Sequence, residues 1–154
     1  MKKFSLFLVV ICCLLVTGCG SSNKEKVVKT LNDFQTVCTN NGFIVVNNMN
    51  GYQGNDYITG SMKATLGDIE IEMVTYDSED NATKAHDNHI KVFNNMKGSG
   101  TILNKDKGKN YYKYDMVSNG YYMVSIRVGN TLVFSKTVVA NKGKVEKVLN
   151  EMDY

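Results

Sequence analysis

The stretch YITGSMKATLGDIEIEMVTY, residues 57–76, carries two runs of alternating apolar and polar residues, separated by Gly67-Asp68. Alternation with a period of two is typical of strands that bury one face, and a two-residue link containing glycine is typical of a tight hairpin. The sequence therefore predicts an antiparallel hairpin, with one strand over 57–66 and the next over 69–76.

The two-residue turn also predicts the register of this hairpin. Pairing Leu66 with Ile69 brings the apolar residues of both strands onto one face and leaves the opposite face polar. The polar face places Lys63 opposite Glu72, an opposite-charge pair of a kind that stabilises a sheet by about 0.2–1 kcal/mol. We therefore expect Glu70 and Glu72 to point to solvent and not to form an acid/base couple. The predicted apolar pairs are Leu66 with Ile69, Ala64 with Ile71, and Met62 with Met73.

A second hairpin is predicted over 111–128. A two-residue turn at 119–120 would place Asp115 opposite Val124, a charged residue against an apolar one. A three-residue loop at 118–120, ending on a left-handed glycine, keeps the apolar residues together and is therefore expected. The tyrosines that this register sends to the core face are Tyr112, Tyr114 and Tyr122.

Apolar residues recur at intervals of three and four in three further segments, a spacing that predicts helices. These helices are expected over 24–39, 79–97 and 142–152. Additional strands are expected at the short apolar runs 43–46, 101–103 and 131–139. In the last run the apolar residues are consecutive, so the pattern leaves its inward face open.

The predicted elements follow the order α-βββ-α-ββββ-α, and the short links between strands favour antiparallel pairing. The expected fold class is α+β, an antiparallel sheet of hairpins with packed helices. The chain of 154 residues is long enough for one such domain and too short for two of ordinary size.

One candidate binding surface lies on the second hairpin, which is rich in tyrosine. If no helix covers the face opposite the core, its residues form an apolar patch at the hairpin tip. Because tyrosine is also a common strand residue, ordinary sheet composition explains the same pattern and stays open as the alternative. The candidate binding patch consists of Tyr111, Val117, Tyr121 and Met123.

His86 and His89, the two histidines of the chain, lie three residues apart on the predicted helix 79–97. This spacing could present both imidazoles to a metal, but a structural zinc site needs four ligands and a catalytic one three. The sequence also lacks a Gly-x-Ser-x-Gly elbow and a phosphate loop between a strand and a helix. We therefore expect no enzyme, no catalytic residues and no cofactor, with a metal-dependent envelope enzyme at these histidines as the less favoured alternative.

The N-terminus begins with the positive residues Lys2 and Lys3, followed by the apolar run FSLFLVVICCLLV over 4–16. A helix needs about 20 residues to cross a hydrocarbon layer of ~30 Å, so this run is short for a permanent span. A positive start followed by a short apolar core is typical of a signal peptide.

The residues that follow, LVTGC at 15–19, resemble the lipobox of bacterial lipoproteins. The resemblance covers residues 1–22, and Val16 is a minor departure from its usual pattern. It implies signal cleavage between Gly18 and Cys19 and a diacylglyceryl thioether, with palmitate-type chains, on Cys19. Beyond the lipobox, the chain is similar only in a general way to small lipoproteins of low-GC Gram-positive bacteria.

This resemblance implies three parts: a signal peptide over 1–18, the lipidated Cys19 with a short tether over 19–24, and a single α+β domain over 25–154. Two acyl chains anchor a protein stably, whereas one chain binds only marginally. The expected location is the extracytoplasmic face of the cell membrane. The Asn- and Lys-rich composition without Pro or Trp favours a Gram-positive cell.

Loss of the signal peptide changes the charge and the cysteine content. Without its two lysines, 16 Lys and Arg face 15 Asp and Glu, which gives no electrostatic basis for binding nucleic acid. Cys12 and Cys13 leave with the signal and Cys19 carries lipid, so Cys38 is left as a thiol. Cys38 falls on the apolar stripe of the predicted helix 24–39, and we expect it to be buried and inert.

These features together predict a membrane-anchored extracytoplasmic lipoprotein that acts as a non-catalytic binding or interaction module. The expected partners are the membrane, contacted through the lipid on Cys19, and a protein, peptide or glycan of the cell envelope. An accessory or structural subunit of a membrane complex is the alternative.

Overall fold

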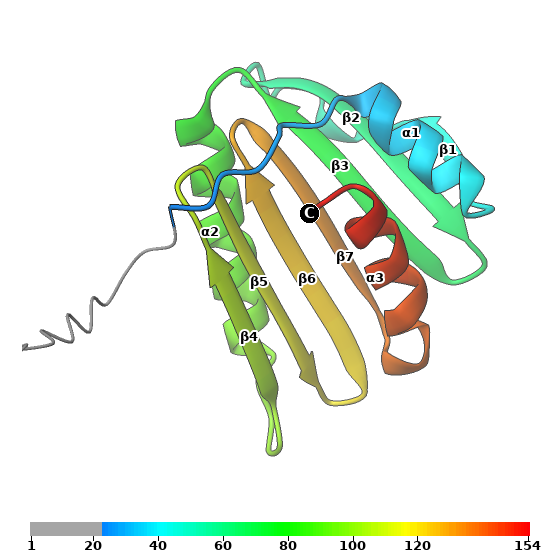
Figure 1. The fold of residues 1–154 in the computed structure, drawn as a ribbon, viewed down its shortest axis with the longest axis vertical. Helices are drawn as coiled ribbons and strands as arrows, with labels where there is room; N and C mark the ends of the chain where they lie inside the picture. Colours follow the sequence, from blue (N-terminus) through cyan, green and yellow to red (C-terminus); the bar gives the residue numbers. More distant parts are fainter. Residues whose placement is uncertain (1–22) are drawn as a thin grey trace, which may run out of the picture.

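The computed structural model describes residues 23–154, which form a seven-stranded antiparallel sheet with helices on both faces (Figure 1). The strands are β1 (Ile44–Asn47), β2 (Ile58–Leu66), β3 (Ile69–Tyr76), β4 (Ile102–Lys107), β5 (Tyr111–Ser118), β6 (Tyr121–Val128) and β7 (Thr131–Val138). The helices are α1 (Leu31–Asn40), α2 (Glu79–Asn95) and α3 (Lys142–Glu151), with the 3-10 helices η1 (Met49–Tyr52) and η2 (Val139–Asn141). The strand order in the sheet is β1-β2-β3-β7-β6-β5-β4.

The expected fold class, an α+β sheet of hairpins with packed helices in the order α-βββ-α-ββββ-α, requires correction. The sheet is held together at its centre by the pairing of β3 with β7, two strands that are far apart in the chain and form no hairpin. Two 3-10 helices, η1 and η2, are added to the order. The structure is a sheet-rich α+β fold in which one continuous sheet is covered from both sides.

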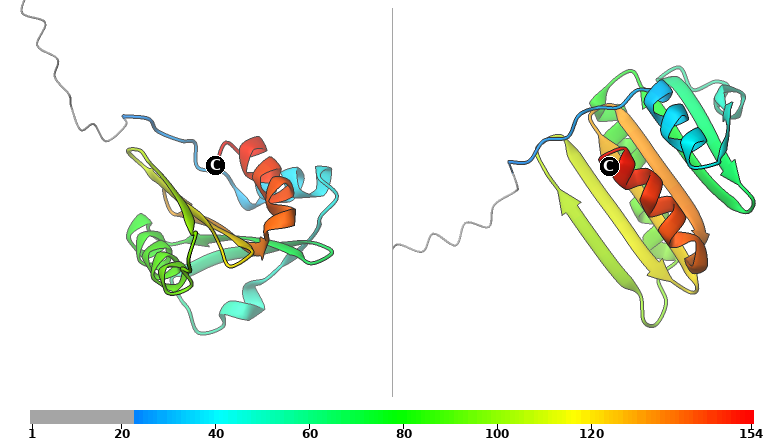
Figure 2. Two further views of the ribbon diagram at one scale, coloured as in Figure 1. Left: turned by 90° about the horizontal axis from the view of Figure 1, so that it is seen from below. Right: turned by 45° about the vertical axis from the view of Figure 1, so that its right-hand side comes forward.

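The two faces of the sheet carry different helices. Figure 2 shows α1 and α3 on one face, and α2 together with η1 on the other. Because both faces are covered, β7 buries consecutive residues: Val133 packs in the core beneath α1 and α3, and Leu132 packs with Ala82 of α2. This arrangement explains why the apolar run at 131–139 showed no alternation.

The first hairpin has the predicted register. Leu66 pairs with Ile69, Ala64 with Ile71 and Met62 with Met73, and Lys63 stands opposite Glu72. The apolar face of this hairpin packs against α1. The polar face, by contrast, is partly covered on the side of α2, which changes the environment of Glu72.

The predicted register of the second hairpin is wrong. The turn has two residues, Asn119 and Gly120, with φ of 51° and 80°, and it places Asp115 opposite Val124. Apolar residues are needed on both sides of this hairpin, because helices cover both sides. Asp115 is buried among them and accepts a hydrogen bond from Asn104 Nδ2 at 3.0 Å. The tyrosines expected on one face are divided: Tyr112 and Tyr114 lie on the α2 side, and Tyr122 on the α3 side.

The first helix begins at Leu31 and not at residue 24. Thr30 caps it, because its hydroxyl accepts from the Asp33 amide while the Asp33 carboxylate accepts from the Thr30 amide. Residues 24–30, here called the N-terminal strap, run extended across the end of the sheet. Helices α2 and α3 begin where predicted and end within two residues of the expected positions.

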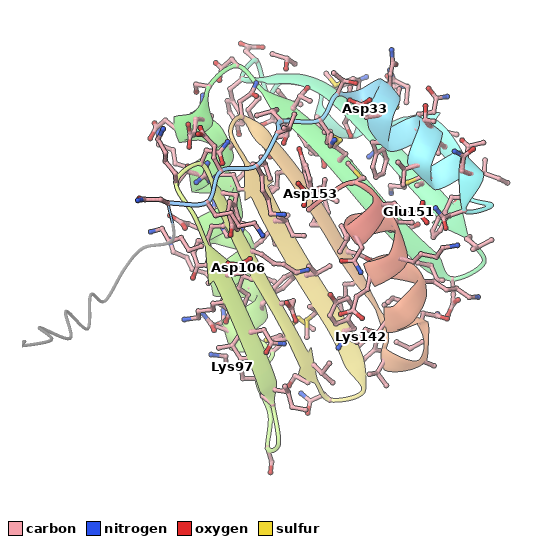
Figure 3. The ribbon with its side chains drawn as sticks, in the orientation of Figure 1. Asp33, Lys97, Asp106, Lys142, Glu151 and Asp153 are labelled. Carbon is pink, nitrogen blue, oxygen red and sulfur yellow. The ribbon has the colours of Figure 1, made fainter. Side chains whose placement is uncertain are left out.

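Hydrogen bonds fix the N-terminal strap to the domain. Asn110 donates from Nδ2 to the Lys26 carbonyl and accepts from the Lys26 amide through Oδ1, at 2.7 and 2.9 Å. The Lys26 ammonium lies 3.1 Å from Asp153, which Figure 3 shows just beyond α3 on the side of the strap. The Lys29 amide donates to the Tyr154 hydroxyl at 3.0 Å. These contacts hold the N-terminal strap against the rest of the domain.

Gly18, Cys19 and the whole predicted signal peptide lie outside the described residues. Within residues 23–154, the helices are too short or too polar for any of them to span a membrane.

Candidate functional site

The candidate patch of Tyr111, Val117, Tyr121 and Met123 does not form a single surface. The observed register puts Tyr111 and Val117 on the face of α1 and α3, and Tyr121 and Met123 on the face of α2. Tyr111 and Met123 are fully buried, Val117 is half-buried, and Tyr121 is 41% exposed. The patch was predicted from the three-residue loop, and it is lost with that loop.

Tyr111 has a structural role in its observed position. Its hydroxyl donates to Asp106 of β4 at 3.0 Å, and the Lys26 ammonium lies 5.3 Å from the centre of its ring. Tyr111 therefore links the sheet to the N-terminal strap and offers no contact surface. Met123 packs against Phe93 of α2 in the core on the other face.

The two histidines of α2 converge on Ser125 of β6. His86 Nε2 lies 3.1 Å from the Ser125 carbonyl oxygen, and His89 Nδ1 lies 3.2 Å from the Ser125 hydroxyl. A carbonyl can only accept, so His86 Nε2 carries the proton in this contact. Burial lowers the pKa of His86, and burial together with the neighbouring His86 lowers the pKa of His89 to about 4. Both imidazoles are therefore neutral near pH 7.

This arrangement explains how the histidines serve the fold. The protonated Nε2 of His86 has no lone pair for a metal, and His89 packs edge-on against Phe134 at 4.4 Å between ring centres. Across residues 23–154, no cluster of three His, Cys, Asp or Glu side chains gathers that could hold a metal ion. The histidines fasten α2 to the sheet.

The face of α2 also carries a groove, which we call the α2 groove. It lies between α2 and the strands β2, β3 and β7, and its volume is about 400 Å³. Its apolar side is made by α2 and by the middle of β7, and its polar side by β2 and β3. The lining residues are Lys63, Glu70, Glu72, His89, Val92, Phe93, Phe134, Ser135 and Lys136.

Glu72 is the most unusual residue of the α2 groove. Its side chain was expected in solvent, but the residue is only 8% exposed. One carboxylate oxygen, Oε1, accepts three hydrogen bonds: from Asn48 Nδ2 at 2.6 Å, from the Tyr52 hydroxyl at 2.8 Å and from the Ser61 hydroxyl at 2.8 Å. All three donors are neutral, so they orient the carboxylate without cancelling its charge.

Sequence reasoning missed Glu72 because the residues that bury it come from another part of the chain. Asn48 and Tyr52 belong to the connection between β1 and β2, and η1 in this connection folds over the sheet on the α2 side. The alternation in β3 assigns Glu72 to the polar face correctly, but it carries no information on what covers that face. The hydrogen-bonding side chains around η1 were the available signal.

The apolar wall of the groove comes from three side chains. Phe134 of β7 lies beneath His89, and Phe93 of α2 is buried beside them. Val92 stands at the rim and is 55% exposed. A surface of this kind favours an apolar body in a ligand, with the polar group directed to Glu72.

Two lysines line the polar rim, and each has a contact of its own. Lys63 Nζ lies 3.7 Å from Oε2 of Glu70, and Lys136 Nζ lies 5.0 Å from the centre of the Tyr121 ring. Within the described residues, Glu72 has no ion pair with either lysine. The buried carboxylate of the groove therefore has no lysine or arginine partner among residues 23–154.

Comparison with known proteins gives little further information. No protein-family model matches the chain, and no curated protein matches it either. A crystal structure of a GTP binding regulator from Thermotoga maritima aligns with 84% of this chain and 92% of its own, at 16% sequence identity and a TM-score of 0.47. A likeness at that score carries no argument about this chain.

Proposed function

We propose that this chain is a membrane-anchored, extracytoplasmic binding lipoprotein, and that the α2 groove is its ligand site. The observation that carries the proposal is a groove with an apolar wall and a buried, oriented carboxylate. Clefts of about 300–1,000 Å³ with a few converging polar groups are the usual form of small-ligand sites. The lipobox resemblance at Cys19 supplies the membrane anchor in this proposal.

The N-terminal strap supports a fixed orientation of the domain on the membrane. Lys24 already contacts the domain, because its carbonyl accepts from the Lys109 amide at 2.9 Å. The segment from Cys19 to Lys24 spans about 17 Å when fully extended, so the lipid would hold the domain close to the membrane surface.

The α2 groove lies toward the other end of the sheet. The strap crosses the sheet near Asn110 and Gly129, which lie at the end where β5 begins and β6 ends. Glu70 and Lys136 lie near the opposite end of β3 and β7, which Figure 1 shows below the strap. An anchored domain would therefore present the groove away from the membrane.

The contacts in the groove favour binding over catalysis. Glu72 is fixed by three neutral donors, and His89 is neutral and bonded to a buried serine. A general acid or base must exchange its proton at the operating pH, whereas the pKa of His89 is held at about 4. The groove is therefore built to hold a ligand in one orientation.

A fragment screen with two matched variants tests this function. The full chain, purified as the cell processes it and placed in lipid nanodiscs, is screened by NMR against a fragment library. Val92→Trp fills the rim of the groove, and Ile102→Trp introduces a tryptophan at a similarly exposed site on β4, outside the groove. We expect fragments that bind the wild type and Ile102→Trp but not Val92→Trp. If no fragment loses binding in Val92→Trp, the groove is not the ligand site.

A further inference from the structure

We propose that the ligand of the α2 groove is an organic cation, an ammonium or guanidinium group on an apolar body, whose charge pairs with Glu72. The inference rests on the proposed function of the groove and names the chemical class of its ligand.

The first step is the hydrogen bonding of the two Glu72 carboxylate oxygens. Oε1 takes all three hydrogen bonds, and Oε2 receives none within residues 23–154. The residue is 92% buried and lines the groove, so Oε2, which none of the three donors contacts, is the oxygen left for a ligand to pair with. Buried charges in proteins are normally paired, because removing a carboxylate from water costs on the order of several kcal/mol. A cation in the groove would supply the missing partner.

The second step is that the cations of the chain near the groove are engaged elsewhere. Lys63 is the direct cross-strand neighbour of Glu72, yet its ammonium lies 3.7 Å from Glu70. Lys136 lies over the Tyr121 ring. His89 is neutral at physiological pH, because burial lowers its pKa to about 4. The described part of the chain, residues 23–154, therefore supplies no cation beside Oε2, and this position is open to an external one.

The third step is the aromatic wall beside the carboxylate, because Phe134 is the cross-strand neighbour of Glu72 on β7. Phe134 and Phe93 are aromatic, and aromatic faces attract cations as well as apolar groups. Val92 extends the apolar surface to the rim. A ligand with a cationic head and an apolar body would satisfy both sides of the groove at once.

An anionic ligand is the competing possibility, because Lys63 and Lys136 also line the groove. Both lysines lie at the rim, and the charge of Lys63 is offset by Glu70. Glu72 is the buried charge of the groove, where electrostatic interactions are less screened by water. Repulsion from Glu72 therefore opposes an anion in the deepest part of the groove.

Three probes with the same phenylethyl body separate these cases: phenethylammonium, 2-phenylethanol and 3-phenylpropionate. The full chain in lipid nanodiscs is titrated with each probe, and the NMR signals of Val92, Phe93 and Phe134 report binding. Free probe is measured from its own signal, with empty nanodiscs to account for uptake by lipid. We expect phenethylammonium to bind at least about tenfold more tightly than the neutral and anionic probes.

Two variants connect the preference to Glu72. Glu72→Gln keeps the shape and an acceptor for the three donors, and should weaken phenethylammonium roughly tenfold. Asp56→Asn removes an exposed carboxylate that does not line the groove and should leave the affinity unchanged. Val92→Trp changes an exposed residue at the rim and should block binding of phenethylammonium. It is the substitute variant if Glu72→Gln fails to fold.

The possible results distinguish this inference from the proposed function. Equal or tighter binding of 3-phenylpropionate or 2-phenylethanol in the groove, or an unchanged affinity in Glu72→Gln, overturns the cation inference while the groove stays a binding site. If Glu72→Gln does not fold, an equal affinity of the wild type and of Val92→Trp for phenethylammonium overturns the cation inference. Failure of every probe to shift the groove signals also overturns it, and the fragment screen then decides the proposed function.

Discussion

Lys63 and Glu72 stand directly opposite each other on β2 and β3, but the Lys63 ammonium lies 3.7 Å from Glu70 and makes no ion pair with Glu72. Lys63 pairs with Glu70 and not with Glu72 because the two carboxylates differ in burial. Glu70 is exposed at the rim, where the long lysine side chain keeps its charge in water, whereas Glu72 is buried beneath the β1–β2 connection. The carboxylate of Glu72 is thus held by neutral donors alone, which is the feature that distinguishes the groove.

The contact between Ser61 and Glu72 should contribute measurably to stability. Ser61 is fully buried and its hydroxyl donates to Glu72 Oε1 at 2.8 Å, so Ser61→Ala leaves a buried carboxylate with one donor fewer. We expect the free energy of unfolding to fall by about 1–3 kcal/mol. Urea denaturation measures the change. Ser99→Ala, at an exposed loop position, should stay within about 0.5 kcal/mol of the wild type; an equally small effect of Ser61→Ala would show that the contact is unimportant.

The histidines of α2 should make the protein less stable in mild acid. Burial lowers the pKa of His89 from its usual 6.5 to about 4 and lowers the pKa of His86 as well, so the unfolded chain binds protons that the folded chain excludes. Their contribution is fully present above pH 6.5 and is lost as the pH falls toward 4. His89 alone should account for about 2 kcal/mol of this loss, after allowance for its partial exposure.

The variant His89→Gln isolates that contribution, because glutamine can still bond Ser125 but does not titrate. Free energies of unfolding measured from pH 7 to pH 4 should fall less steeply for His89→Gln than for the wild type. Parallel curves for the two proteins would mean that His89 is not buried in its neutral form.

Cys38 should be unreactive in the folded protein. Its side chain belongs to α1 and is fully buried in the core, and burial raises the pKa of the thiol to about 12, so very little thiolate exists at pH 8. Iodoacetamide should modify Cys38 only after unfolding, which mass spectrometry of native and denatured samples would show. Labelling of the native protein at the rate of the denatured one would contradict the observed packing.

Two glycine substitutions should have opposite effects. Gly120 has a φ of 80° in the turn between β5 and β6, so Gly120→Ala should destabilise the protein by about 1 kcal/mol. Gly143 lies in α3 with no atom close to the position of a Cβ, so Gly143→Ala should stabilise it by roughly 0.5–1 kcal/mol. Thermal unfolding of both variants tests the left-handed conformation of Gly120. Tolerance of alanine at position 120 would contradict that conformation.

The sequence predicted elements well where local periodicity decides them. The first hairpin, with Gly67 in its tight turn, has the predicted register, because one of its faces is polar and the other apolar. The second hairpin offered no such contrast, since helices cover both of its sides and Asp115 is buried among apolar residues. Where both faces are buried, alternation no longer distinguishes one register from another.

The α2 groove could not be predicted from the sequence for a related reason. Glu72 gains its three donors from Asn48, Tyr52 and Ser61, of which only Ser61 lies on the paired strand. The N-terminal strap was also missed, because its hydrogen bonds to Asn110 and Tyr154 join residues more than eighty positions apart. Long-range contacts of this kind leave no pattern in a single sequence.

The anchoring of the domain through Cys19 is tested most directly by intact mass spectrometry of the chain from the membrane fraction. The expected mass is that of a chain beginning at Cys19 and carrying a diacylglyceryl group, and Cys19→Ser should abolish both the cleavage and the lipid. A chain that keeps residues 1–18, or a released chain without acyl mass, would contradict the proposed membrane-anchored function.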